Sequence, residues 1–109
     1  MTVTELAAKC GFNVIAIPEP KREVNGVYIG DLLSWVMGRA SADCAWITIM
    51  SNVNVIAVAS LSDAACVILA EGVIPDGEIT ELANAKGINL ISSRLSAYET
   101  AVLLSEILK

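Results

Sequence analysis

An apolar stretch in the middle of the chain limits what this protein can fold into. Residues 44–62 contain no charged side chain, and about 20 such residues are enough for a membrane-spanning helix. The centre of the stretch, however, reads Ser51-Asn52-Val53-Asn54, and amide and hydroxyl side chains at that depth are costly in lipid. We therefore expect no membrane span, and interpret the stretch as a buried strand, a turn and a buried helix.

The β-branched runs around that turn indicate a parallel sheet. Ala45–Met50 and Cys66–Ala70 are apolar without strict alternation, which is typical of strands covered on both faces. Residues 51–65 have the length of a helical crossover, so we expect a helix over Asn52–Leu61. The β-branched residues leave open a second strand at Val53–Ala59. Three further strands are expected at Asn13–Ile17, Val27–Ile29 and Ile88–Ile91.

Two capping boxes predict the first and last helices. In Thr2–Glu5 and Ser96–Glu99 a hydroxyl and a carboxylate stand three residues apart, so that each can bond a free amide at the helix start. We expect the first helix to end before Gly11, where glycine suits a left-handed closing residue. The last helix is expected to run to Leu108.

Two more helices are expected from caps and periodicity. Asp76 is a cap residue after Pro75, and Gly87 follows Lys86 as a stop. Another helix is expected to end at Gly38. Its predicted apolar face consists of Ile29, Leu32, Leu33 and Val36.

Strands alternating with helices predict a three-layer α/β/α domain with a mostly parallel sheet. The 109 residues fit one domain. Residues 1–23 would supply its amino-terminal helix and strand and the beginning of a loop. Residues 18–26, with two prolines and four charged side chains, are expected to form an exposed, mobile loop.

Composition restricts the possible functions. The net charge of −5 opposes binding to nucleic acid and to anionic membranes. The cysteines Cys10, Cys44 and Cys66 form no CxxC pair, so we expect neither a disulfide scaffold nor a metal site, and a reducing cytoplasm fits best. The chain has no histidine, the commonest general base. We therefore expect no catalytic residues, no cofactor and no enzyme activity.

A ligand site, if the sheet carries one, is expected at the carboxyl ends of its parallel strands. The residues there are small, polar and of mixed charge, which suits a nucleotide or other small metabolite and equally suits ordinary caps. The candidate residues are Gly30, Asp31, Ser51, Asn52, Asn54, Glu71, Gly72, Ser92, Ser93 and Arg94.

Within this set, we expect Ser51, Asn52 and Arg94 to form any anion site, because a helix start exposes amides and arginine supplies positive charge. For Arg94 itself, an ion pair with a surface carboxylate or a helix end is favoured over an anion site. The turn at Glu71-Gly72 is a weaker candidate, because residues 71–76 combine one glycine with a proline and two carboxylates. We interpret it as a structural turn rather than a phosphate cradle.

Three segments carry a family resemblance: GVYIGDLLS, AWITIMSNVNVIAVASLSDAACVILAEG and VIPDGEITELANAKGINLISSRLSAYETA. Over residues 24–108 the chain resembles the DRTGG domain, and its last third resembles the amino-terminal domain of HPr kinase/phosphorylase. The resemblance implies the fold of that domain and a regulatory role, as in some phosphotransacetylases and proteins with paired CBS domains. It also implies a link to anaerobic redox or hydrogenase metabolism.

The signature of the family is degenerate in this chain. The family usually has Gly-Asp-Arg at the positions that correspond to Met50-Ser51-Asn52 of this chain, or to the triplet one position along, where neither Asp nor Arg occurs. Where the family has Gly-Gly, this chain has Glu71-Gly72. Ligand contacts that the family makes through its Asp and Arg therefore do not carry over. The kinase motif G-x-x-x-x-G-K-[ST] is absent from the sequence.

Two functions are compatible with these observations. The first is a noncatalytic regulatory module that self-associates and docks to a partner protein; the second is a sensor of a nucleotide or metabolite. The mean hydropathy is +0.64, and the core of one small domain is not expected to bury all of the apolar side chains. We therefore expect a homodimer that covers the remaining apolar surface. Its interface is expected on the helix with Trp35 and Met37, or on Asn52–Leu61.

Overall fold

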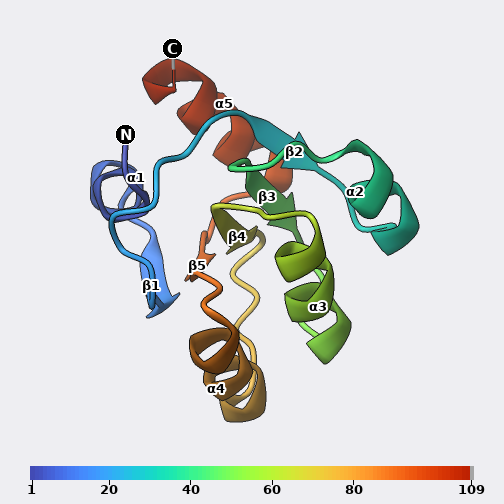
Figure 1. Ribbon diagram of the computed structural model, residues 1–109. Coiled ribbons are helices and arrows are strands. Elements are labelled where there is room, and N and C mark those ends of the chain that lie inside the picture. The colour runs from blue at the N-terminus through green and yellow to red at the C-terminus, as the bar shows by residue number, and fades with distance from the viewer. Residues whose placement is uncertain (109) are drawn as a thin grey trace.

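The computed structural model describes residues 1–108 as five strands between two helical layers (Figure 1). The elements in chain order are α1 (Val3–Cys10), β1 (Asn13–Ala16), β2 (Val27–Ile29), α2 (Leu33–Arg39), β3 (Ala45–Thr48), α3 (Val53–Leu61), β4 (Cys66–Leu69), α4 (Gly77–Lys86), β5 (Leu90–Ser92) and α5 (Ala97–Ile107).

One sheet contains all five strands, in the order β1-β5-β4-β3-β2. The four strands from β2 to β5 are parallel, and β1 pairs antiparallel with β5 at one edge. β2 forms the other edge. The prediction of a mostly parallel sheet is confirmed.

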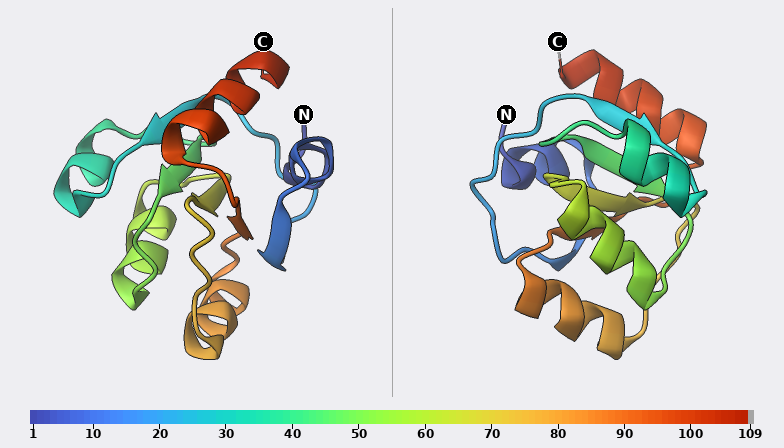
Figure 2. Two further views of the ribbon diagram at one scale, coloured as in Figure 1. Left: turned by 180° about the vertical axis from the view of Figure 1, so that it is seen from behind. Right: turned by 45° about the vertical axis from the view of Figure 1, so that its right-hand side comes forward.

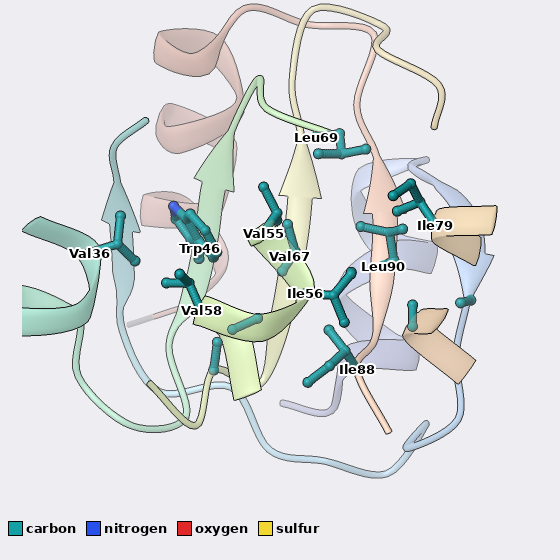
Figure 3. Close-up of a cluster of buried hydrophobic side chains, with 14 of the residues drawn as sticks. Val36, Trp46, Val55, Ile56, Val58, Val67, Leu69, Ile79, Ile88 and Leu90 are labelled. Carbon is teal, nitrogen blue, oxygen red and sulfur yellow. The ribbon is translucent and has the colours of Figure 1, made fainter. Parts of the chain in front are cut away.

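Helices cover both faces of this sheet (Figure 2). On one face α2, α3 and α4 enclose a core that contains the fully buried Trp46 together with Val55, Ile56 and Leu90 (Figure 3). On the other face α1 and α5 contribute Leu6 and Leu104 to a second core. The predicted three-layer arrangement is therefore confirmed. No helix among residues 1–108 has the length and apolar character needed to span a membrane.

The predicted caps form as expected. The Thr2 hydroxyl accepts from the Glu5 amide at 3.2 Å while the Glu5 carboxylate accepts from the Thr2 amide at 3.0 Å, and Ser96 and Glu99 repeat this exchange. Asp76 caps α4, and Gly87 ends it in the left-handed conformation. Because hydrogen bonds between residues close in sequence fix these helix ends, the ends are predictable without knowledge of the tertiary structure.

Residues 53–61 are helical, as predicted, and the alternative strand at Val53–Ala59 is wrong. The Asn52 side chain caps α3 by accepting from the Asn54 amide at 3.0 Å. The β-branched residues Val55, Ile56 and Val58 are buried. Tertiary burial thus overrides their preference for strand.

The boundaries predicted for α2 are wrong. Gly38 lies inside the helix, which runs to Arg39, and Gly38 does not adopt the left-handed conformation that a closing glycine needs. Ile29 belongs to β2 and Leu32 precedes the helix; both are about half exposed. Only Val36 of α2 is buried, because the predicted face is divided between two elements.

Several predicted strands end early or start late. β3 stops at Thr48 instead of Met50, because the Ile49 amide donates to the Asp31 carboxylate at 3.0 Å rather than to a neighbouring strand. β5 runs Leu90–Ser92 instead of starting at Ile88, whose amide donates to Ala83 at the end of α4. β1 and β4 end one residue earlier than predicted.

Most residues of the segment 18–26 are exposed, as expected, but contacts with distant parts of the chain anchor this loop to the domain. Val24 is buried, and the Arg22 guanidinium donates to the carboxylates of Asp43 at 2.9 Å and Asp63 at 2.8 Å. The buried side chain of Asn89 binds the backbone of Glu19 through both its oxygen and its nitrogen, at 2.9 and 2.8 Å. These partners are distant in sequence, so composition could not predict the contacts that anchor the loop.

Asn89 provides a test of how the loop is held. Its nitrogen also donates to the Ala65 carbonyl at 3.0 Å, so Asn89→Ala leaves three backbone groups without their partner. We expect the free energy of unfolding to fall by about 2–4 kcal/mol. The control Asn84→Ala, at an exposed position of α4, is expected to change it by less than about 0.5 kcal/mol. Urea denaturation of both variants measures this, and equal effects would contradict the assignment.

Candidate ligand site at the carboxyl ends of the strands

The candidate residues follow the four parallel strands and therefore lie along one edge of the sheet. Figure 3 shows the arrowheads of neighbouring strands at the same end. Gly30-Asp31 follows β2, Ser51-Asn52 lies after β3, Glu71-Gly72 lies after β4, and Ser93-Arg94 follows β5. The topology thus brings together four junctions that are far apart in sequence.

Gly30 and Asp31 close the junction between β2 and β3. The indole nitrogen of Trp46 donates to the Gly30 carbonyl at 2.8 Å. Asp31 Oδ1 accepts from the Thr48 hydroxyl at 2.6 Å and from the Ile49 amide. These bonds give the Asp31 carboxylate a structural role and fix its position at this part of the edge.

The turn at Glu71-Gly72 consists of two consecutive left-handed residues, with φ of 62° and 71°. Their amides donate to the carbonyls of Leu95 and Ser93, both at 2.8 Å. An anion cradle requires free amides, and these two are occupied within the chain. The geometry therefore supports the structural interpretation of this turn.

The two serines after β5 are likewise engaged in the fold. Both are buried. The Ser92 hydroxyl donates to the Val73 carbonyl at 3.0 Å, and the Ser93 hydroxyl pairs with the Thr100 hydroxyl at 2.8 Å while accepting from the Leu95 amide. Hydroxyls with internal partners are poorly available to a ligand.

The remaining candidates divide between two hollows. Arg94 lines one of about 380 Å³ together with Phe12 and Asn13. Ser51 and Asn52 line another of about 430 Å³, whose far wall carries the carboxylates of Asp76 and Glu78. Asn54 is exposed and lies in α3 beyond the cap. The structure thus places Arg94 and the Ser51-Asn52 pair on different hollows.

Arg94 is exposed, and it forms no salt bridge within residues 1–108. The ion pair that was favoured for it is therefore not observed there. Its neighbours Phe12 and Asn13 were missed from the sequence. They reach the site because β1 pairs antiparallel with β5, placing Asn13 opposite Ser92. The sequence pattern identifies β1 as a strand but does not indicate which strand it pairs with. The β-branched run was therefore the only sequence signal for Phe12 and Asn13, and it did not place them at the site.

The cysteine thiols are held in their neutral form. Burial raises the pKa of Cys10, which lies beside Arg94. Burial also raises the pKa of Cys44, and the Asp43 carboxylate adds to this effect. Burial raises the pKa of the Cys66 thiol to about 12. Within residues 1–108 no cluster of three His, Cys, Asp or Glu side chains is arranged to hold a metal ion.

The fold and the sequence define the class of this chain: it belongs to the DRTGG domain family, whose pattern it matches over residues 5–107. The match extends the resemblance, which began at residue 24, through β1 and most of α1. No curated protein matches the chain.

A solved structure shares the fold: the crystal structure of the CBS and DRTGG domains of the regulatory region of Clostridium perfringens pyrophosphatase, complexed with the activator diadenosine tetraphosphate. The TM-score is 0.74 at 16% sequence identity. The comparison covers 94% of this chain but 45% of the other. At this identity the likeness concerns the fold.

Because the Cys66 thiol is buried, we expect the free energy of unfolding to decrease at alkaline pH. The unfolded thiol loses its proton near its ordinary pKa of 9.0, whereas the folded thiol keeps it until about pH 12. Between these values the unfolded state binds fewer protons, so the free energy of unfolding falls as pH rises, by about 1.4 kcal/mol per pH unit. Below pH 9 this contribution is constant. Denaturation of the native chain and of Cys66→Ala across pH 8–11 measures the difference in slope; parallel curves would contradict the prediction.

Proposed function

We propose that this chain is a noncatalytic regulatory module that acts by associating with protein surfaces, first of all with a second copy of itself. One observation carries this proposal: large apolar side chains remain exposed around β2 and α2. Ile29, Leu32 and Trp35 expose 49%, 56% and 53% of their surface. Apolar exposure concentrated in one region of a domain is typical of an association surface.

The packing of α2 supports this location. Only Val36 of the helix is buried, so α2 contributes little to the core of the isolated domain. α3, the other interface candidate, buries Val55, Ile56, Val58 and Ala59 between its neighbours. Val53 and Leu61 of α3 stay exposed, but α3 buries four apolar residues and α2 only Val36, which favours the helix with Trp35 as the interface.

Membership of the DRTGG family and the regulatory region named for the pyrophosphatase support a regulatory role. Free thiols at Cys10, Cys44 and Cys66 support a reducing compartment such as the cytoplasm. Docking to a separate partner protein, and the link to anaerobic redox metabolism, stay predictions that rest on the family resemblance.

Sedimentation equilibrium at micromolar concentration tests self-association. We expect a mass near twice 11.5 kDa. Trp35→Ser removes a large exposed aromatic and is expected to shift the equilibrium toward monomer by about tenfold or more. Leu61→Ser, at a position of α3 that is 72% exposed, is the matched control and should leave the mass unchanged. A native mass near 11.5 kDa would reject self-association, and loss of the dimer only in Leu61→Ser would move the interface to α3.

A second candidate function is sensing of a small anionic ligand, favoured by the hollow beside Arg94. The Arg94 guanidinium has no ion-pair partner within residues 1–108. Phe12 in the same hollow is half-buried, so an aromatic ring and a positive charge lie on one surface. A nucleotide offers both a planar base and phosphate groups. That the similar pyrophosphatase region was crystallised with a dinucleotide activator adds support.

A thermal-shift screen of nucleotides and anionic metabolites tests the sensor. A ligand at 100 times its dissociation constant is expected to add about 2.7 kcal/mol to stability. Arg94→Ala should then weaken binding by about tenfold or more. Asn52→Ala is the control, because Asn52 lines the other hollow; if it weakens binding equally, the ligand does not occupy the Arg94 hollow alone. Absence of any shift across the screen would remove the support for a sensor.

A further inference from the structure

β2 is a free sheet edge between two helical layers. It pairs with β3 on one side and ends the sheet on the other. In the view of Figure 1 α2 and α5 lie to either side of the sheet at this end. A free edge presents backbone groups that another strand can bind.

The ladder between β2 and β3 fixes which groups are free. The Gly26 carbonyl accepts from the Ala45 amide at 2.9 Å, and the Gly30 amide donates to the Ile47 carbonyl at 3.1 Å. Backbone groups of successive strand residues point to opposite sides. Gly26, Tyr28 and Gly30 therefore face β3, and the amides and carbonyls of Val27 and Ile29 face outward.

This pattern is complementary to itself. If two copies of β2 lie antiparallel, Val27 of one copy stands opposite Ile29 of the other, and each such pair can exchange two backbone hydrogen bonds. Tyr28 then meets the second Tyr28 on the two-fold axis, at a position where Cα atoms stand about 4.5 Å apart. The same surface is used by both copies, as a two-fold dimer requires.

Side chains on both faces of the edge fit such a pairing. Leu32, Trp35 and Arg39 follow one side of α2, and Arg39 stacks over the Trp35 ring at 3.9 Å. Arg39 shares a hollow with Asn25 and Val27, so this side of α2 faces the edge. On the opposite face, Val27 and Ile29 are in register with Ala45 and Ile47 of the core beneath α5, yet they remain 38% and 49% exposed.

Charge is complementary in the same register. Antiparallel pairing places the start of one β2 opposite the end of the other, so the segment before one β2 approaches Asp31, which lies two residues past the end of the other. Arg39 lines a hollow with Asn25, so it is a cation on the side of the edge that would approach that carboxylate. The hydrogen bonds of Asp31 within the chain use Oδ1, and the pair would occur twice by symmetry.

We propose that β2 pairs antiparallel with β2 of a second copy about a two-fold axis at Tyr28, joining two sheets into one of ten strands, with Trp35 and the Arg39–Asp31 pairs on its flank. This pairing rests on the self-association proposed above and specifies how the copies meet. Backbone bonds set the register, and the apolar side chains of Leu32 and Trp35 supply most of the affinity.

Two variants of Ile29 test the role of the backbone. Ile29→Pro removes an outward amide that the β2–β3 ladder does not use, which an edge strand tolerates. It should raise the dissociation constant by about tenfold or more beyond the effect of Ile29→Ala, which keeps the amide. Sedimentation equilibrium measures both variants, and circular dichroism verifies that each is folded. Equal dissociation constants for the two folded variants would overturn the pairing.

A cross-link tests the register. In a Cys10→Ser background, Tyr28→Cys places two thiols at the axis within disulfide range, whereas Glu81→Cys on α4 serves as the exposed control. On mild oxidation we expect a covalent dimer from the first variant only. A native mass of two copies without this cross-link, and without an effect of Ile29→Pro, would reject the pairing but retain self-association. A monomeric native mass would reject both.

Discussion

Burial of the central strands on both faces is the constraint on which the rest of this structure depends. Every residue of β3, β4 and β5 is buried. Strands of this kind cannot leave one face in water, so helices must cover both sides. Parallel neighbours also require crossovers, and right-handed crossovers through α3 and α4 place those helices together on one face. The three layers and the shared carboxyl edge follow from this constraint.

The same constraint gives the two ends of the sheet different roles. At the amino ends of β3 and β4, Arg22 connects Asp43 and Asp63, both in the left-handed conformation. At the carboxyl ends the junctions are closed chiefly by backbone donors and short hydroxyl side chains. The turn at Glu71-Gly72 most resembles a phosphate cradle, but its two amides already have acceptors. These hydrogen bonds connect the turn after β4 to the segment after β5.

Features set by residues within one turn of each other were predictable from the sequence. The caps of α1, α4 and α5 depend on pairs such as Thr2 and Glu5, so their chemistry appears in a short stretch. The order of elements also followed from alternating patterns. The end of β3 was not predictable, because it depends on Asp31, whose bond to the Ile49 amide spans 18 residues. The division of the candidate site into two hollows likewise depends on β1 lying beside β5, which no local pattern encodes.

The signature positions and the β2 edge differ in how available they are for binding other molecules. At the first signature position Asn52 caps a helix, and at the second Glu71-Gly72 forms a turn with internal partners; neither position supplies a free cation. Arg94 excepted, the polar groups of the carboxyl edge largely satisfy one another. Around β2 the backbone groups that face outward have no strand within residues 1–108 to pair with, and the side chains of Ile29 and Trp35 are exposed beside them. Groups without internal partners are those available for recognition, and beside β2 outward backbone groups and exposed apolar side chains occur together.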